Sequence, residues 1–307
     1  MNQYMEPVID PVDKQLLREE FAKAPVLEEA SRGNAVMHLV DCHYPSILRE
    51  VGRIREMAFR RLGAGTGKDT DLDRFDLDPA LGFQQLVLWD KEEEEVMGGY
   101  RVVTGDRWTL DAGGQPDLPS ARLFHFSEEF INGPMRKTVE LSRSFIAADY
   151  QRNSENARRN VFTLDCLLQD IAAVTARAGM EHFFGKVTFY PDYPAEALSI
   201  VHAFMKAHCE DSPGLIAPHR PFIPKKATDV QDYTEGDFQQ YFRGLVKRLR
   251  EKGYALPPIL KSYMGICSLP VSFYGFTVDP AFGGVTEMGL VCHVAAVKKD
   301  RFAAFSQ

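Results

Sequence analysis

The chain has 307 residues, a length that suits one large domain or two of ordinary size. Its 43 acidic residues outnumber its 36 basic residues and give a net charge of -7, which argues against a general nucleic-acid-binding protein. With 45% hydrophobic and 26% charged residues, the composition is that of a globular protein rather than a disordered or fibrous one.

The cysteines are far apart and include no Cys-x-x-Cys pair, so the sequence offers no thiolate zinc or redox motif and fits a reducing cytosol. The acidic N-terminal segment carries prolines where an export signal needs a basic start and an apolar run. No stretch approaches the roughly 20 apolar residues that span a bilayer. We therefore expect a cytoplasmic protein whose membrane contact is at most peripheral, at the inner face.

The predicted elements begin with a polar leader of about 1–35, which contains a short helix at Asp13–Phe21. A first strand is expected at Val36–Val40. From Ser46, apolar residues recur at helical spacing and predict a long helix, which the glycines of Leu62–Lys68 end. That glycine segment is interpreted as a loop and not as a Walker phosphate loop, because its glycines stand one residue too close together.

The remaining pattern predicts a mixed α/β core. Two strands joined by a charged turn indicate a hairpin, and further strands alternate with helices. The interruption at about 210–256 is interpreted as an insertion, so that 1–307 forms a single domain. The expected strands are Gln84–Trp89, Val96–Val103, Thr138–Ala147, His182–Phe189, Val271–Val278 and Gly289–Val297, and the expected helices are Val161–Val174, Ala195–His208 and Asp237–Lys252.

The segment Glu140–Phe145 is unusual for a strand in the middle of a sheet. Strict alternation places Glu140, Ser142 and Ser144 on one face and Leu141, Arg143 and Phe145 on the other, so that charged groups occur on both faces. A buried carboxylate or guanidinium must be paired, hydrogen-bonded or turned toward a cleft. We favour a functional cleft over the alternative, a buried ion pair with Arg55 or Asp76.

Four short motifs together resemble one enzyme family. They are Glu140-Leu-Ser-Arg143, Arg55-Glu-Met-Ala-Phe59, Asp73-Arg-Phe-Asp76 and Gly99-Tyr-Arg101. In their order and spacing they resemble acyl-carrier-protein-dependent N-acyltransferases of the GNAT superfamily. That group includes the acyl-homoserine-lactone synthases and, more similar to this chain, the aminolipid synthases that acylate ornithine or glycine, often labelled haemolysins. The resemblance runs from about Ser46 to Ala304 and implies the GNAT fold, a mixed, mostly antiparallel sheet flanked by helices.

The resemblance also implies an activity and a site. A fatty or 3-hydroxyacyl group would pass from acyl carrier protein to the amine of an amino acid, glycine or ornithine. Glu140 would accept the proton of the amine, and backbone N–H groups near Phe145 and Ile146 would stabilise the oxyanion. Arg101 and Arg143 would orient the pantetheine or a carboxylate. The site residues implied are, for catalysis, Glu140, Ser142 and Arg143; for substrate binding, Arg55, Phe59, Asp73, Asp76 and Arg101; and for the acyl donor, Phe145, Ile146, Arg152, Arg158 and Arg159.

One departure from the family pattern bears on the donor. Many GNAT enzymes hold the pyrophosphate of coenzyme A in a glycine-containing loop after the central strand. The matching segment here is Arg152–Ala157, in which Glu155 would oppose a pyrophosphate. That favours acyl carrier protein, with its phosphopantetheine thioester, over acyl-coenzyme A, and no permanently bound cofactor or metal is expected. Arg152, Arg158 and Arg159 would contact the arm or its carrier, or else form a solvated first helical turn.

Other interpretations stay open. A coenzyme A-dependent small-molecule acetyltransferase would share the fold but lack an acyl tunnel, for which Phe183, Phe184 and Phe189 are candidate lining or core residues. An acyl-homoserine-lactone synthase would be about a hundred residues shorter, as the resemblance implies. A membrane-acting haemolysin or a noncatalytic binding module belongs to another class. The basic face of the helix Asp237–Lys252 is either solvated or a dock for the carrier or an anionic membrane.

Overall fold

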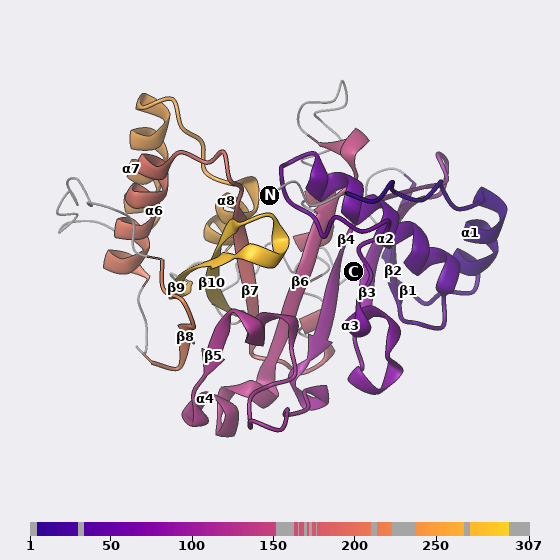
Figure 1. Cartoon of the computed structure of the whole chain (residues 1–307), viewed down its shortest axis with the longest axis horizontal. Helices are drawn as coiled ribbons and strands as arrows, with labels where there is room; N and C mark the ends of the chain where they lie inside the picture. The colour runs from indigo at the N-terminus through magenta and orange to yellow at the C-terminus, as the bar shows by residue number, and fades with distance from the viewer. Residues whose placement is uncertain are drawn as a thin grey trace.

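A computed structural model of the protein describes residues 5–29, 34–151, 163–164, 166–168, 171, 174–175, 177–209, 214–222, 238–266 and 271–294. Eight strands form one sheet in the order β1-β2-β3-β4-β6-β7-β10-β9, in which every neighbouring pair is antiparallel except β6 and β7 (Figure 1). These strands are β1 Val26–Glu29, β2 Ala35–Val40, β3 Gln84–Asp90, β4 Glu95–Thr104, β6 Thr138–Ile146, β7 His182–Phe189, β9 Ser272–Asp279 and β10 Val285–His293. The mixed, mostly antiparallel sheet that the sequence predicted is confirmed.

Helices cover both faces of this sheet. On one face α2 lies against the strands, where Arg55 reaches the side chain of Gln85 on β3. On the other face the described residues among 163–177 are helical, and Leu167 lies so close to Gly98 that a Cβ there would be 3.3 Å from it. The helices are α1 Lys14–Phe21, α2 Pro45–Arg60, α3 Arg74–Leu77, α4 Glu128–Asn132, α6 Ala195–His208, α7 Phe238–Glu251 and α8 Pro258–Ile266.

Local signals explain why several elements begin and end where they do. Asp13 caps α1 by accepting a hydrogen bond from the Gln15 N–H at 2.7 Å. Pro45 stands at the start of α2, where its missing N–H costs nothing, and the glycine loop of 62–68 follows the end of the helix at Arg60. The predicted helices at 13–21 and 195–208 and the predicted strands at 36–40, 84–89, 96–103, 138–147 and 182–189 are confirmed to within two residues.

Some elements differ from the sequence expectation. The leader contains β1, so the strand predicted as the first is the second of the sheet. The last strand begins at Val285 rather than Gly289, because Val285–Met288 pair with β9 and β7. Short β5 (Phe124–Phe126) and β8 (Ile216–Pro218), which pair with each other, were not predicted, nor were α3, α4 and α8. The expected helix residues Val161, Phe162 and Asp237 and the strand residues 295–297 lie outside the described residues.

The helices that the structure describes are each too short or too polar to cross a membrane.

Candidate active site

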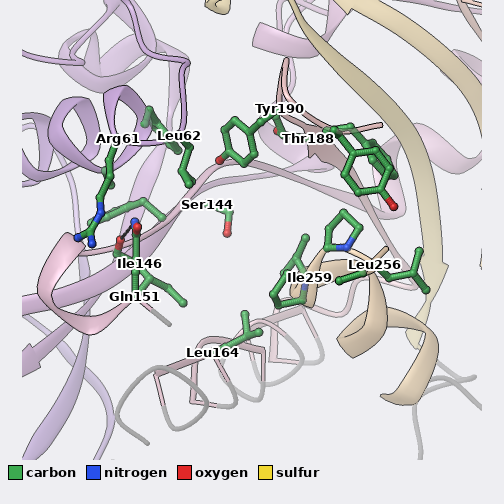
Figure 2. A pocket seen from close by; sticks show the side chains of 18 of the residues that line it. Arg61, Leu62, Ser144, Ile146, Gln151, Leu164, Thr188, Tyr190, Leu256 and Ile259 are labelled. Carbon is green, nitrogen blue, oxygen red and sulfur yellow. Dashed lines mark hydrogen bonds between the residues drawn. The ribbon is translucent and has the colours of Figure 1, made fainter. Parts of the chain in front are cut away.

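The central feature of the sheet is a gap between β6 and β7. These parallel strands are paired only at Thr138–Glu140 with His182–Phe184, and they separate beyond Glu140. A chamber of about 530 Å³ occupies the gap (Figure 2). We call it the large chamber. Its wall includes Ala58 and Phe59 at the end of α2, Arg61 and Leu62 just after it, Ser144, Phe145 and Ile146 of β6, Lys186, Thr188 and Phe189 of β7, Leu164, Tyr190, Tyr193, and residues 255–259, which lead into the first turn of α8.

The large chamber passes through the sheet. In Figure 2, Ser144 lies between Arg61 and Leu62, which follow α2, on one side and Leu164 and Ile259 of the opposite helices on the other. Its lining is mostly apolar, as is typical of sites that bind a hydrocarbon ligand. Of the phenylalanines predicted as tunnel lining, Phe189 lines the chamber, whereas Phe183 and Phe184 pack in the protein core.

A bulge in β6 breaks the alternation that the sequence predicted. Ser142 pairs with Arg101 and Phe145 pairs with Gly99, so Arg143 and Ser144 together face the single residue Tyr100 of β4. Arg143 takes a left-handed backbone conformation, with φ of 50°. Phe145 therefore lies on the same face as Ser142, and the prediction that they lie on opposite faces is wrong.

The strand register also gathers a row of polar side chains on one face of the sheet. Gln85 pairs with Arg101, Arg101 with Ser142, Lys186 with Gly289 and Thr188 with Glu287. Because paired residues of neighbouring strands point to the same side, these side chains and Glu140 share the face that α2 covers. This row runs across the central strands from β3 to β10.

Beneath α2, part of this row forms a buried charge cluster. The Asp76 carboxylate accepts hydrogen bonds from Arg55 Nη2 and Arg101 Nη1, each at 3.0 Å, and from Gln85 Nε2 at 2.9 Å. Arg55, Asp76 and Arg101 are buried. Burial by itself raises the pKa of Asp76, but the two guanidinium groups outweigh it and lower that pKa to about 2. Asp73 accepts from Arg101 Nη1 at 2.7 Å and caps α3.

A small polar chamber opens where β6 and β7 begin to separate. It has a volume of about 60 Å³ and shares Phe59, Ser144, Lys186, Thr188 and Tyr190 with the large chamber, so the two chambers adjoin. We call it the polar chamber; it is lined by Phe59, Tyr100, Leu141, Ser142, Arg143, Ser144, Lys186, Thr188, Tyr190, Tyr263, Phe282 and Glu287.

One backbone N–H of β6 faces the gap. The Ala147 N–H donates to the Met97 carbonyl of β4 at 2.9 Å. Because successive N–H groups of a strand point to opposite sides, the Ile146 N–H is turned away from β4 and toward the gap, whereas the Phe145 N–H is turned toward β4. Of the two predicted backbone donors, the geometry favours Ile146.

The structure brings together most of the residues that the motifs indicated. Arg55, Asp73, Asp76, Arg101, Ser142 and Arg143 form one network, and Phe59 lines both chambers. Arg143 pairs with Asp71 at 2.8 Å rather than with Asp76. Glu140 is fully buried beside Arg101, and neither carboxylate oxygen has a hydrogen-bond partner within the described part of the chain. Arg152, Glu155, Arg158 and Arg159 lie outside the described residues.

Glu140 does not line either chamber, so its assignment as the proton acceptor stays a prediction. Sequence reasoning missed Asp71, Lys186, Thr188 and Glu287. Lys186 and Thr188 stand in a predicted strand whose alternation already placed them on one face. Glu287 precedes the segment predicted as the last strand, so nothing local indicated that it faces Thr188.

One group of side chains in the described residues has atoms close enough to ligate a metal ion. It consists of the consecutive residues Asp41, Cys42 and His43, with ligand atoms within 4.8 Å of one another. The Asp41 carboxylate already accepts hydrogen bonds from the backbone and the ring of His43, at 3.0 and 2.9 Å. An exposed turn of this kind needs no ion to explain it.

The sequence is similar to a known protein family and to known enzymes. Residues 54–158 match the family model of the GNAT acetyltransferase domain. Over 97% of its length the chain is 33% identical to the glycine N(alpha)-acyltransferase of Bacteroides thetaiotaomicron, of which it covers 88%. It is 32% identical to the protein of the same name from Phocaeicola vulgatus, again over 97% of this chain and 91% of that protein.

Solved structures with similar architecture are more distant. FeeM, an N-acyl amino acid synthase from uncultured soil microbes, superposes with a TM-score of 0.42 at 8% identity, over 88% of this chain and 99% of that chain. The acyl-homoserine-lactone synthase LasI gives a TM-score of 0.43 at 11% identity, over 89% of this chain and 96% of that chain.

Proposed function

Because the chain belongs to the family of the glycine N(alpha)-acyltransferases, N-acyltransferases of the GNAT type, we propose that it transfers a fatty or 3-hydroxyacyl group from acyl carrier protein to glycine, as a step in aminolipid synthesis. The observation that carries the proposal is the pair of adjoining chambers in the gap between β6 and β7, one mostly apolar and one polar. An acyl thioester and a small zwitterion need those two environments side by side.

The large chamber suits the acyl donor. A pantetheine arm that enters between the separated strands would bring its thioester carbonyl near Ile146, whose N–H points into the gap. A backbone donor fixed in this position can stabilise the oxyanion that forms when an amine attacks the thioester. The apolar wall from Leu164 to Ile259 would take the acyl chain.

The polar chamber suits the acceptor. Its volume of about 60 Å³ is small beside the 530 Å³ of the large chamber. Aromatic rings of Phe59, Tyr190 and Phe282 stand around it, so glycine fits better than an amino acid with a long side chain. Ornithine is therefore the second candidate.

Direct detection of the product tests the proposal. The purified protein is incubated with acyl carrier protein loaded with a 3-hydroxyacyl chain and with glycine, and N-acylglycine is measured by mass spectrometry. We expect N-acylglycine to form and N-acylornithine, from a parallel reaction with ornithine, to be minor. Predominant acylation of ornithine would overturn the acceptor assignment, and absence of any amide product would overturn the activity.

The donor is tested by a direct comparison of rates. We expect kcat/KM to be at least about tenfold higher with acyl carrier protein than with acyl-coenzyme A of the same chain, a difference of ~1.4 kcal/mol in transition-state binding. The physical reason is Glu155, whose charge would oppose a pyrophosphate more strongly than the single negative charge of a phosphodiester. Equal values for the two donors would contradict this reading of Glu155.

The basic helix α7 is the proposed dock for the acidic carrier. Arg243, Lys247 and Arg250 are exposed on it, and the chain leads from its end directly to residues 255–259 of the large chamber. Lys247 has one weak contact, to Glu251 at 3.8 Å.

Reversal of two of these charges, Arg243→Glu with Lys247→Glu, is expected to raise the KM for acyl carrier protein about fivefold, with little change in kcat. The effect should fade at high salt, since exposed charges are screened over a Debye length of about 8 Å at physiological ionic strength. Lys23→Glu with Arg49→Glu, which reverses two exposed charges near α2, is the matched control. An unchanged KM would mean that the basic face of α7 is simply solvated.

A further inference from the structure

Glu287 is a buried carboxylate placed at the polar chamber by the longest ladder of the sheet. It lies near the start of β10, paired with Thr188 of β7 and Thr277 of β9, and is 4% exposed. Its Oε2 atom accepts a hydrogen bond from Thr188 Oγ1 at 3.1 Å. Both residues line the polar chamber, and Thr188 also lines the large chamber.

Three charged residues on the other strands act on the Glu287 carboxylate. Lys186 of β7 and Arg143 of β6 attract it, and Asp279 at the end of β9 repels it. Burial is the largest influence and raises the pKa of Glu287, with Asp279 acting in the same direction against Lys186, Thr188 and Arg143. The carboxylate also contributes to a raised pKa of the Tyr190 phenol, which burial mainly causes. A raised pKa makes the Glu287 carboxylate a stronger proton acceptor than an ordinary surface glutamate.

The two cations leave room for a second carboxylate. The side-chain ammonium group of Lys186 forms no hydrogen bond with any residue that the structure describes, although it lines the chamber. Arg143 uses Nε to bind Asp71 at 2.8 Å, its Nη2 atom is 3.9 Å from Asp73, and its guanidinium lies 4.9 Å from the centre of the Phe282 ring. The left-handed backbone of Arg143 is a strained conformation for a non-glycine residue, and strain of this kind tends to occur where a side chain must be aimed.

Glu140 is also a buried carboxylate beside a guanidinium group, that of Arg101, but it differs from Glu287 in its access to the gap. It lines neither chamber, and neither of its carboxylate oxygens has a hydrogen-bond partner in the described part of the chain. A group that accepts a proton from a substrate must reach that substrate within hydrogen-bond distance, directly or through a water molecule.

We propose that the polar chamber is the binding site for the amino-acid acceptor, in which Glu287 pairs with the ammonium group and accepts its proton while Lys186 and Arg143 bind the carboxylate. This inference rests on the proposed function and identifies the residues that perform it. Thr188 is a positioning residue, because it holds the carboxylate of Glu287 through one hydrogen bond.

In the chemical step, the amine of the amino acid replaces the thiol on the acyl carbon. The Glu287 carboxylate takes one proton from the ammonium group and becomes a carboxylic acid. The freed amine nitrogen forms a bond to the thioester carbon, whose oxygen becomes an oxyanion beside the Ile146 N–H. As the oxyanion collapses, the carbon–sulfur bond breaks and the sulfur takes a second proton from the nitrogen, which gives an amide and a free thiol. Glu287 returns its proton to water.

The first test compares Glu287→Gln with Glu140→Gln in wild-type background, with glycine and saturating acyl donor across the pH range. Glu287→Gln is expected to lower kcat/KM for glycine by about 100-fold or more. It should also abolish the loss of activity at acid pH that protonation of Glu287 causes in the wild type. Glu140→Gln should keep this loss of activity at acid pH, the acid limb of the pH profile. Thermal unfolding of both variants shows whether a fall in activity reflects impaired catalysis or unfolding of the protein. An acid limb that vanishes in Glu140→Gln and persists in Glu287→Gln would overturn the proposal.

A second test uses the positioning residue. Thr188→Val removes the hydrogen bond that favours the charged carboxylate, so the acid limb should move to higher pH. Thr277→Val, on the opposite side of Glu287 in the same register, is the matched control and should leave the limb in place. Identical profiles for the two valine variants would contradict the role of Thr188.

Measurement of glycine binding in the absence of an acyl donor tests the acceptor site independently of the proposed function. Isothermal titration calorimetry of the donor-free protein is expected to show glycine binding that Glu287→Gln or Lys186→Met weakens about tenfold or more, as expected when one partner of a charge pair is removed. Glycine bound equally by all three proteins would overturn the acceptor site even if the wild type acylates glycine. Normal glycine binding with no transfer from any donor would instead overturn the proposed activity and leave the site standing.

Discussion

Asp76→Asn is expected to cost about 3–5 kcal/mol of folding free energy, because it leaves the buried guanidinium groups of Arg55 and Arg101 without their shared countercharge. All three side chains are fully buried, so water cannot replace the lost carboxylate. Urea denaturation at neutral pH measures the difference. A loss below ~1 kcal/mol, the range of surface ion pairs, would show that the cluster relaxes instead.

The pH dependence of this difference has a definite sign. The folded-state pKa of Asp76 is lowered from 3.8 to about 2, so its contribution is present above pH ~4 and lost as the pH falls toward 2. The gap in stability between wild type and Asp76→Asn should therefore narrow over that interval. Glu181→Gln is the control, since Glu181 pairs with Lys137 at the surface with side-chain exposures of 55% and 57%.

Ile146→Pro is expected to lower kcat by about 100- to 1,000-fold while the protein still folds, because it removes the N–H that faces the gap and would stabilise the oxyanion. This N–H points away from β4, so proline at 146 breaks no hydrogen bond of the β4–β6 ladder. The measurement is single-turnover acyl transfer together with thermal unfolding.

For Ala147→Pro, one residue later in the chain, we expect the opposite result, a loss of stability without loss of the oxyanion donor. The Ala147 N–H donates to the Met97 carbonyl, so its loss should destabilise the fold without removing the oxyanion donor. Comparable unfolding temperatures for the two proline variants, or full activity in Ile146→Pro, would show that the strand register was assigned to the wrong side.

Elements with strong local patterns were predictable from the sequence. The apolar spacing of α2 and α6 and the alternation of β7 depend only on neighbouring residues, and the structure places them within two residues of the expected bounds. The glycine segment 62–68 is a loop, as predicted, and its Thr66 and Gly67 N–H groups donate to Glu56. The motif residues Arg55, Asp76 and Arg101 meet because oppositely charged buried groups must find partners.

The parts that could not be predicted depend on pairing between distant strands. The bulge at Arg143 arises from the register of β6 against β4, which places Phe145 opposite Gly99. Without its partner strand, the segment is expected to alternate regularly between the two faces of the sheet. That expectation places Phe145 on the wrong face. Glu287 and Thr188 are 99 residues apart in sequence, and only the β7–β10 ladder brings them together.

The parallel junction of β6 and β7 has a mechanical consequence. It joins two antiparallel parts of the sheet, with β1, β2, β3, β4 and β6 on one side and β7, β10 and β9 on the other, and it holds three registered residue pairs where the β7–β10 ladder holds eight. A molecule bound in the gap touches both parts at once. Its binding free energy therefore also holds the two parts of the sheet together, so occupancy of the chambers and rigidity of the fold are linked quantities.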